Sequence, residues 1–243
     1  MKLLIICLIA LFNLGNEQYA AGEYAEAATT YNRILTDSLA AGLPAADRAA
    51  IYYNLGNACF RMGELSQSIL AYERCLRLRP TFSDARYNLR FAQSRIVDNI
   101  EDNQAFFLSN GLKFVRNLLT CNAWTLLSIC LFVLTLVGLL LFALLHDPGW
   151  RKAAFFTAIV AFVISICAVA NAASLHSRDT LRREAIITQG VVNAKASPDR
   201  SGTDLFTLHE GTKVTIHETI GEWCNIHVGN NVGWIKLNNL ERI

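Results

Sequence analysis

The seven cysteines have the widest chemical range of any side chains in this 243-residue sequence. A thiolate can act as a nucleophile, bind a metal or form a disulfide. Their number is odd, no two stand in a Cys-x-x-Cys spacing, and no histidine completes a metal-ligand pattern beside them. Five lie in apolar helical patterns, where a free cysteine behaves as a small hydrophobe. We expect buried thiols; the alternative is a Cys59–Cys75 disulfide or redox pair, if the domain lies outside the cytoplasm.

The chain lacks the patterns that indicate other chemistry. It contains no nucleophile with a base motif, no glycine-rich phosphate loop after a strand, no His-Glu-x-x-His and no recognisable carboxylate pair. The net charge is +2, and there is no Lys/Arg-rich run with interleaved aromatic residues, which excludes the usual nucleic-acid binders. We therefore expect a protein that is not an enzyme and has no cofactor, metal or nucleic-acid partner.

A repeat must position any functional residue in the first half of the chain. "YNLGN" begins at Tyr53, "YNLRF" follows 34 residues later at Tyr87, and "FNLGN" precedes it by 41 at Phe12. Residues 49–82 have the bulky and small side chains, the turn glycine and the final proline of two antiparallel helices. These positions are Tyr52, Leu55, Gly56, Cys59, Gly63, Ser68, Tyr72, Cys75 and Pro80. The pattern predicts a tetratricopeptide repeat in which Gly56 and Ser68 lie where the helices come closest.

The outer units differ from the middle one. The first unit has matching residues at Leu14, Gly15, Gly22, Ala27 and Tyr31, whereas the third has only a first helix, which we expect to cap the stack. The repeat module is thus expected over 11–99, an α-solenoid of two repeats and a capping helix. Residues 1–12 form a signal-like apolar segment that overlaps the first helix. It fits an uncleaved export signal, and a misplaced start codon explains the overlap equally well.

The first helices of such repeats line a concave groove, where we expect a protein partner to bind. Asparagine amides can pair with a peptide backbone, and aromatic rings supply contact area. The alternative, that the asparagines satisfy neighbouring helix ends, has equal weight. The candidate groove residues are Phe12, Asn13, Asn16, Tyr53, Asn54, Asn57, Tyr87 and Asn88.

The middle of the chain is apolar enough to enter a membrane. Segments 124–145 and 153–174 have 22 residues each and no charge, which is long enough for two transmembrane helices joined as a hairpin. The second has a seam of small residues that lets another helix approach closely, either the first span or a partner subunit. The seam consists of Ala158, Ala161, Ser165, Ala168 and Ala172.

The residues around the spans bear on orientation. An amphipathic pattern over 105–122, with Lys113 and Arg116 among apolar residues, predicts a helix lying at the membrane interface. The Lys/Arg count on the two sides of the hairpin favours cytoplasmic termini, whereas the signal-like start favours the opposite side. The sequence leaves both orientations open.

Short β-type runs broken by turn residues occupy 184–243 and predict a small all-β module. Their order is similar to a bacterial SH3 domain, so we expect an SH3-like barrel. Two tryptophans, Trp223 and Trp234, either fill its interior or contact a ligand, and packing is the favoured interpretation. The matching residues are "NAKASP", Leu208, Gly211, Val214, Gly221, Trp223, Ile226, Gly233, Trp234, Ile235 and Leu240.

The whole arrangement resembles the BatE-type proteins of the Bacteroides aerotolerance (Bat) operon. The resemblance rests on "YYNLGNACFRMGELSQSILAYERCLRLRP", "DARYNL", "NAW" before the first span and "SGTDLFTLHEGTKV". It implies a multi-pass protein of the bacterial inner membrane with both soluble modules in the periplasm. It also implies partners among the von Willebrand A-type membrane proteins of the same operon.

Two functions remain after these exclusions. The first is a membrane-anchored interaction scaffold whose repeat groove binds a partner, in a Bat aerotolerance-type membrane complex. The alternative is a protein that senses or anchors the cell wall, with peptidoglycan bound by the SH3-like module. A redox sensor at Cys59 and Cys75 is a weaker third hypothesis.

Overall fold

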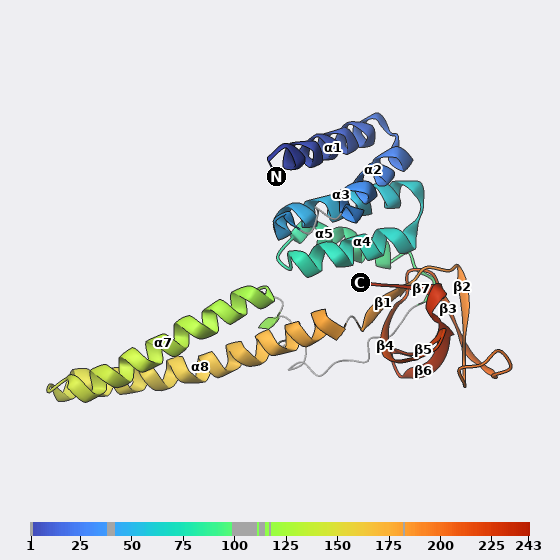
Figure 1. Ribbon diagram of the computed structural model, residues 1–243. Helices are drawn as coiled ribbons and strands as arrows, with labels where there is room; N and C mark the ends of the chain where they lie inside the picture. The colour runs from blue at the N-terminus through green and yellow to red at the C-terminus, as the bar shows by residue number, and fades with distance from the viewer. Residues whose placement is uncertain (1, 38–41, 99–110, 112–114, 117, 182) are drawn as a thin grey trace. The chain divides into compact units, whose positions relative to one another are not determined.

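The computed structural model describes residues 2–37, 42–98, 111, 115–116, 118–181 and 183–243. The chain divides into two compact units, Met1–Phe106 with Arg182–Ile243, and Phe107–Leu181. The first unit contains a stack of helices and a β-sheet, and the second contains two long apolar helices (Figure 1). The segments before and after the apolar helices therefore belong to one body.

Five helices of the first unit follow one another in a stack, and each packs on its neighbour in the chain (Figure 1). The signal-like segment and the first repeat helix are one continuous helix. Leu8, inside that segment, is only 5% exposed and packs in the core formed with the next two helices, so this part of the segment belongs to the first repeat. The helices are α1 (Lys2–Ala21), α2 (Tyr24–Thr36), α3 (Ala45–Met62), α4 (Leu65–Leu78) and α5 (Ser83–Gln93).

Two glycines allow the paired helices to approach closely. A Cβ atom at Gly56 would lie 2.6 Å from Cε1 of Tyr72, and one at Gly15 would lie 2.7 Å from Cε1 of Tyr31. The Ser68 hydroxyl donates a hydrogen bond to the Gly56 carbonyl at 2.9 Å, which only a small residue on the facing helix permits. The close approach expected at Gly56 and Ser68 is confirmed, and the first repeat uses the same arrangement.

The C-terminal residues form one antiparallel seven-stranded sheet in the order β3-β2-β6-β5-β4-β1-β7. The edge strands β3 and β7 do not pair with each other, so the sheet is open and the expected closed barrel is not formed. Strand β7 pairs with β1 through its three residues, and the amide of Ile243 after it donates a hydrogen bond to the Glu184 carbonyl of β1 at 3.0 Å. The Ile243 side chain packs in a helical core. The strands are β1 (Glu184–Ile187), β2 (Val191–Lys195), β3 (Asp204–His209), β4 (Lys213–Ile220), β5 (Trp223–Val228), β6 (Asn231–Lys236) and β7 (Leu240–Arg242).

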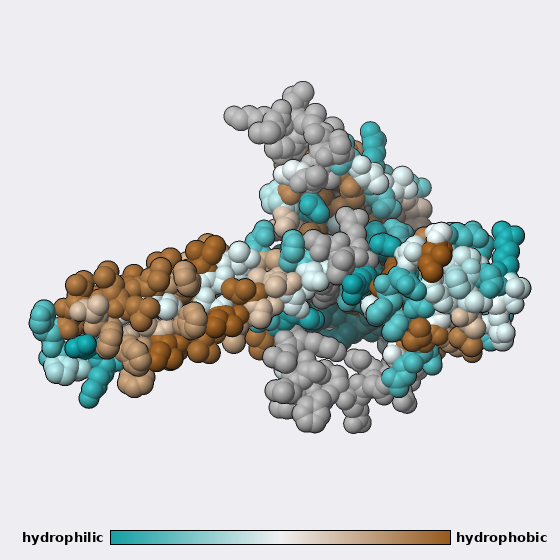
Figure 2. All heavy atoms as spheres, turned by 60° about the horizontal axis from the view of Figure 1, so that its bottom comes forward, coloured by the Kyte–Doolittle hydropathy of each residue, from teal (hydrophilic) through white to brown (hydrophobic). Residues whose placement is uncertain are grey.

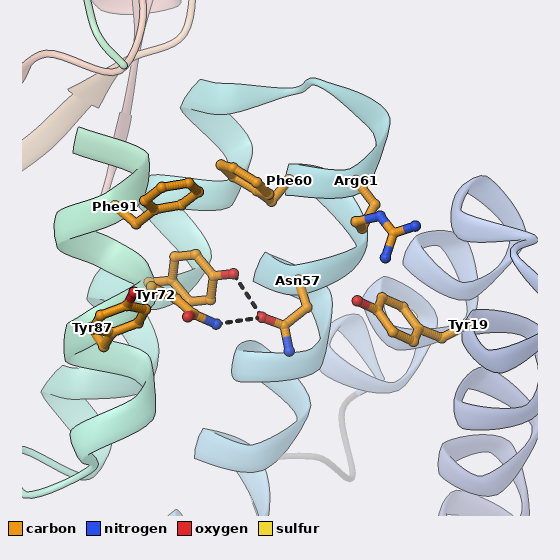
Figure 3. Close-up of a pocket in the computed structure, with 8 residues that line it drawn as sticks. Tyr19, Asn57, Phe60, Arg61, Tyr72, Tyr87 and Phe91 are labelled. Atoms are coloured by element: carbon orange, nitrogen blue, oxygen red, sulfur yellow. Dashed lines mark hydrogen bonds between the residues drawn. The ribbon is translucent and has the colours of Figure 1, made fainter. Parts of the chain in front are cut away.

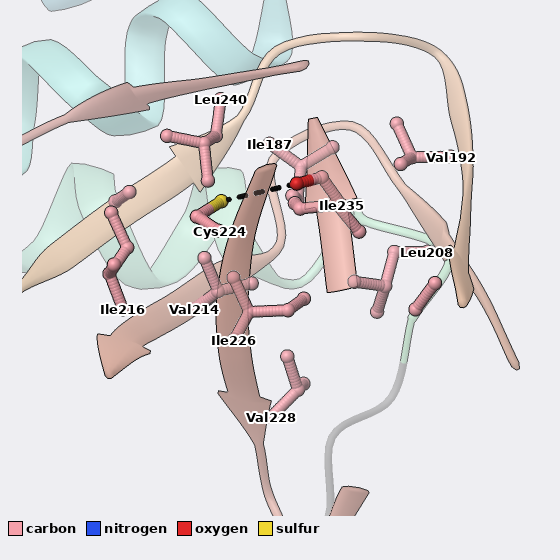
Figure 4. Close-up of a cluster of buried hydrophobic side chains, with 12 residues drawn as sticks. Ile187, Val192, Leu208, Val214, Ile216, Cys224, Ile226, Val228, Ile235 and Leu240 are labelled. Carbon is pink, nitrogen blue, oxygen red and sulfur yellow. Dashed lines mark hydrogen bonds between the residues drawn. The ribbon is translucent and has the colours of Figure 1, made fainter. Parts of the chain in front are cut away.

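The sheet curves around a core of its own (Figure 4). Alternate residues of its strands point inward, as the period of two requires; in β5, Cys224, Ile226 and Val228 are all buried. The Cys224 thiol lies 3.5 Å from the Ile235 carbonyl, and burial raises the pKa of this thiol to about 11. Cys224 therefore acts as a small core residue.

Neighbouring residues of β1 face two different cores. Ala185 and Ile187 pack inside the sheet, whereas Ile186, between them, packs against the helices. The C-terminal Ile243 lies in the same helical cluster, and the chain terminus is seen beside α4 (Figure 1). One face of the helix expected to cap the stack therefore packs in a core shared with the sheet. The helical side of this cluster consists of Ile69, Leu70, Tyr72, Leu89 and Ala92.

The turn between β3 and β4 also contacts the helices. Gly211 has a φ of 83°, and a Cβ atom there would lie 2.7 Å from Ile96 Cγ2 and 3.1 Å from Ile69 Cδ1. Only glycine satisfies both the left-handed backbone and this close approach. The Lys213 ammonium, just after the turn, pairs with Glu73 of α4 at 3.0 Å and with Glu184 of β1 at 3.1 Å.

Asp98, five residues after the end of α5, binds the same turn. One of its carboxylate oxygens accepts hydrogen bonds from the His209 amide and the Thr212 hydroxyl, both at 2.7 Å. The other oxygen lies 2.6 Å from His209 Nδ1. Burial opposes ionisation of this carboxyl, but the hydrogen bonds from Thr212 and His209 outweigh it and hold the pKa of Asp98 below its ordinary value.

We expect Asp98→Asn to lower the free energy of unfolding by about 2 kcal/mol at pH 7, because a charged hydrogen-bond acceptor is lost. The pKa of Asp98 is lower in the folded than in the unfolded chain, where it is about 3.9. Its stabilisation is therefore complete above about pH 5 and is lost as the pH falls through 4 and below. Urea unfolding of the detergent-solubilised protein should show a wild-type-to-variant difference in the free energy of unfolding that narrows as the pH falls from 5 to 3. The exposed Glu17→Gln is the control; an Asp98 gap that does not change with pH would contradict this account.

The second unit is a helical hairpin of α7 (Cys121–Leu144) and α8 (Pro148–Leu181). Both are long and apolar enough to cross a membrane, α7 over its 24 residues and α8 over the 30 residues of Pro148–Ser177. Both helices begin a few residues before the predicted spans 124–145 and 153–174, and α8 extends beyond Ser174. Their surface is predominantly hydrophobic, with hydrophilic residues at the hairpin tip (Figure 2).

The small-residue seam of α8 packs against α7. Of the two neighbours that the sequence allowed, the first span or a partner subunit, the structure shows the first span. Ala158, Ala161, Ser165 and Ala168 are buried there. A Cβ atom at Gly138 of α7 would lie 2.9 Å from Ala158 Cβ. The Ser165 hydroxyl donates a hydrogen bond to the backbone carbonyl of Ser128 in α7 at 3.1 Å. This bond joins the two helices at their close contact. Most of the interfacial helix expected at 105–122 lies outside the described residues.

Candidate functional site

Asparagine side chains connect the first helices of successive repeats. Asn16 Oδ1 accepts hydrogen bonds from the Tyr31 hydroxyl and from Asn54 Nδ2, each at 2.8 Å. Asn54 belongs to α3, so one carbonyl oxygen joins a tyrosine of its own repeat to an amide of the next. Burial raises the pKa of Tyr31 to about 12, so its hydroxyl remains a donor at physiological pH.

The same arrangement recurs one repeat later. Asn57 Oδ1 accepts from the Tyr72 hydroxyl at 2.7 Å and from Asn88 Nδ2 of α5 at 2.9 Å. Burial also raises the pKa of Tyr72. We call these two sets of bonds the asparagine ladder. It ends at α5, because Phe91 stands 34 residues after Asn57, where another ladder asparagine would be needed.

The ladder shows that four of the candidate asparagines bond to other residues of the repeats. Asn16 and Asn57 use the carbonyl oxygen of the side-chain amide, and Asn54 and Asn88 use its nitrogen. The amide assignments follow from this network, since an oxygen must face the two donors. Asn57 Nδ2 and Asn88 Oδ1 have no partner among the described residues, so both remain able to pair with a peptide group.

A pocket of about 260 Å³ opens where the ladder ends (Figure 3). Three predicted groove residues line it, namely Asn57, Tyr87 and Asn88. Tyr87 is 64% exposed and Phe91 is 45% exposed, so two aromatic rings of α5 remain accessible to a ligand. The other lining residues, apart from Phe91, are Tyr19, Phe60, Arg61 and Tyr72, none of which was predicted for the groove.

The helical period could have identified part of this unpredicted set. Phe60 and Arg61 follow Asn57 by three and four residues, and Tyr19 follows Asn16 by three, which puts them on the same helix face. One helical turn after the aromatic positions, the predicted groove set included only the asparagines.

Two guanidinium groups flank the aromatic residues of the pocket. Arg61 lies over the Tyr24 ring, 4.6 Å from its centroid. Arg95 lies 5.6 Å from the ring centroid of Phe60 and 4.9 Å from that of Phe91. Neither forms an ion pair with any described residue. Arg61 lines the pocket itself, and cation–π contacts hold Arg95 over two of the pocket's rings.

The remaining predicted groove residues are not among those that line the pocket. Phe12 packs partly buried against the repeat core, with its ring 6.1 Å from that of Tyr31. Tyr53 packs against Phe82, with 4.9 Å between ring centroids, and its hydroxyl lies 3.4 Å from Asn88 Nδ2. Asn13 is exposed.

The two tryptophans of the sheet differ in accessibility. Trp223 is 8% exposed, and Lys236 Nζ lies 5.6 Å from its ring centroid. Trp234 is half-buried and pairs in register with Asn225 and Lys195 of the neighbouring strands. Packing therefore accounts for Trp223, whereas Trp234 keeps part of its ring available for a ligand.

The alternative prediction of a disulfide between Cys59 and Cys75 is wrong. Both thiols are free and buried, Cys59 in the core of the first repeats and Cys75 in a separate cluster with Ala49 and Ala85. Burial raises the pKa of each thiol to about 12, which leaves almost no thiolate at neutral pH. This environment disfavours the redox-sensor hypothesis.

Comparison with known protein families finds a match within the helical part of the chain. Residues 49–82 match the tetratricopeptide repeat family. These residues form a tetratricopeptide repeat. A solved structure with similarity to the chain is the TPR2AB domain of yeast Sti1 in its complex with pHSP90, at 16% identity and a TM-score of 0.34. The match covers 69% of this chain and 61% of that one, and a search of curated proteins gives no match.

Proposed function

We propose that the protein is a non-enzymatic, membrane-anchored scaffold whose repeat groove binds a segment of a partner protein. The pocket at the end of the asparagine ladder is the observation that supports this most. It combines accessible aromatic surface with a free amide donor, Asn57 Nδ2, and a free acceptor, Asn88 Oδ1. A donor and an acceptor next to apolar surface fit the alternating groups and side chains of a peptide.

The contacts inside the first unit support this anchoring. The sheet packs on α4 and α5, so residues before and after the hairpin lie on the same side of any membrane that the hairpin crosses. Two crossing helices between them fit that requirement. We place both soluble parts in the periplasm of a bacterial inner-membrane protein, as the resemblance to BatE-type proteins implies. A topology reporter fused to the C-terminus tests this location.

The partners we propose are the von Willebrand A-type membrane proteins of a Bat-type operon. We expect the double variant Tyr87→Ala/Phe91→Asp to reduce their recovery with the full-length protein at least tenfold, because both side chains are exposed in the pocket. The measurement is quantitative co-purification from solubilised membranes. Val97→Asp, at a 73% exposed residue outside the pocket lining, should leave recovery unchanged. If the Tyr87→Ala/Phe91→Asp variant recovers as much partner protein as the wild type does, the pocket is not the partner-binding site.

The second candidate function is peptidoglycan binding by the sheet, which we propose to be an opened relative of the SH3 fold. The partly accessible ring of Trp234 favours this alternative. Sedimentation of the full-length protein with purified sacculi tests it, and the result should depend on Trp234 rather than on Tyr87 and Phe91.

A further inference from the structure

We infer that the pocket recognises an aromatic side chain of a peptide that has acidic residues next to it. This inference rests on the proposed function, since it specifies the ligand of the same groove. It follows from the size of the pocket, the nature of its walls and the charge at its margin.

The size and the walls select the central side chain. A volume of about 260 Å³ lies below the roughly 300–1,000 Å³ of pockets for drug-sized ligands, so the pocket fits a single large side chain. Tyr19, Phe60, Tyr87 and Phe91 surround this space with ring surface (Figure 3). Aromatic rings pair favourably with one another in tilted and edge-to-face arrangements, as Phe60 and Phe91 already do with 5.5 Å between centroids.

The charge at the margin selects the neighbouring residues. Arg61 lines the pocket, and Arg95 lies over both Phe60 and Phe91. Both guanidinium groups lack a carboxylate partner among the described residues. A carboxylate beside the central ring would pair with such a group, and a basic residue there would be repelled.

The polar groups of the ladder hold the ligand backbone. Asn57 Nδ2 can donate to a peptide carbonyl, and Asn88 Oδ1 can accept from a peptide amide. Their positions are fixed by bonds to Tyr72 and to each other, so little side-chain entropy is lost on binding.

The test uses the full-length protein in detergent and a fluorescent synthetic peptide with a central phenylalanine between glutamates. Three matched peptides replace the phenylalanine by alanine, the glutamates by glutamine, or the glutamates by lysine. By fluorescence polarisation we expect the Phe/Glu peptide to bind most tightly. The glutamine peptide should bind about tenfold more weakly, because each exposed ion pair adds up to about fivefold. The alanine peptide should lose at least tenfold, and the lysine peptide should show no binding.

Variants connect the charge preference to its residues. Arg61→Gln/Arg95→Gln should abolish the difference between the glutamate and glutamine peptides, whereas Arg33→Gln, on the exposed side of α2, should preserve it. Equal binding of the glutamate and glutamine peptides by the wild type would overturn the inference. So would an absence of binding by every peptide. Neither result would decide the proposed function, which depends on whether the Tyr87 and Phe91 variant still recovers its protein partners.

Discussion

Gly56→Ala should destabilise the repeat module by about 2 kcal/mol, although alanine is normally about 1 kcal/mol better than glycine inside a helix. The new methyl group would lie 2.6 Å from Cε1 and 2.7 Å from Cδ1 of Tyr72. The Tyr72 ring is 2% exposed, and its hydroxyl is bound to Asn57, so it cannot move without breaking a ladder bond. The cost of overpacking therefore exceeds the gain in helix propensity. Urea unfolding of the full-length protein in detergent measures the difference.

Two further substitutions test this explanation. Gly15→Ala should be destabilising for the same reason, because its methyl group would lie 2.7 Å from Tyr31 Cε1. Gly190→Ala should change the free energy of unfolding by less than about 0.5 kcal/mol, because nothing lies within 4 Å of a Cβ atom there. If Gly56→Ala is as stable as wild type or more stable, the close packing of α3 on α4 is not as described.

Ile186→Ala should lower the free energy of unfolding by about 2–5 kcal/mol and should loosen the end of the helical stack. Ile186 is fully buried against α4 and α5, where it packs with Ile69 and Leu89. Its truncation leaves a cavity between the sheet and the helices rather than inside the sheet. Hydrogen exchange should therefore accelerate in α4 and α5.

The adjacent residue provides a matched control. Ile187 is also fully buried, but it packs in the core of the sheet. Ile187→Ala should cost a similar free energy while exchange accelerates mainly in the strands. The same exchange pattern for both variants would indicate that the sheet and helices do not share the interface formed by Ile186 and Ile243.

Local sequence patterns were sufficient to predict the repeat helices and the hairpin. Gly56 and Tyr72 lie 16 residues apart in two adjoining helices, and the repeat recurs at a fixed spacing, so their contact follows from the phase of the pattern. The seam from Ala158 to Ala168 follows from helical periodicity in the same way. Both predictions concern neighbours in the chain, for which periodicity and spacing determine which faces meet.

The tertiary structure alone decided how the sheet closes the first unit and where the pocket forms. Asp98 binds His209 from 111 residues away, and Glu73 binds Lys213 from 140 residues away. No local pattern distinguishes Ile186 from Ile187, because both are apolar β-branched residues of one strand. A strand that is buried on both faces loses the alternation by which its two faces are told apart. The sequence predicted a barrel because the order of its β-type runs is similar to that of a bacterial SH3 domain. In the structure the edge strands β3 and β7 do not pair, and β1 and the C-terminal Ile243 pack instead in a core shared with α4 and α5.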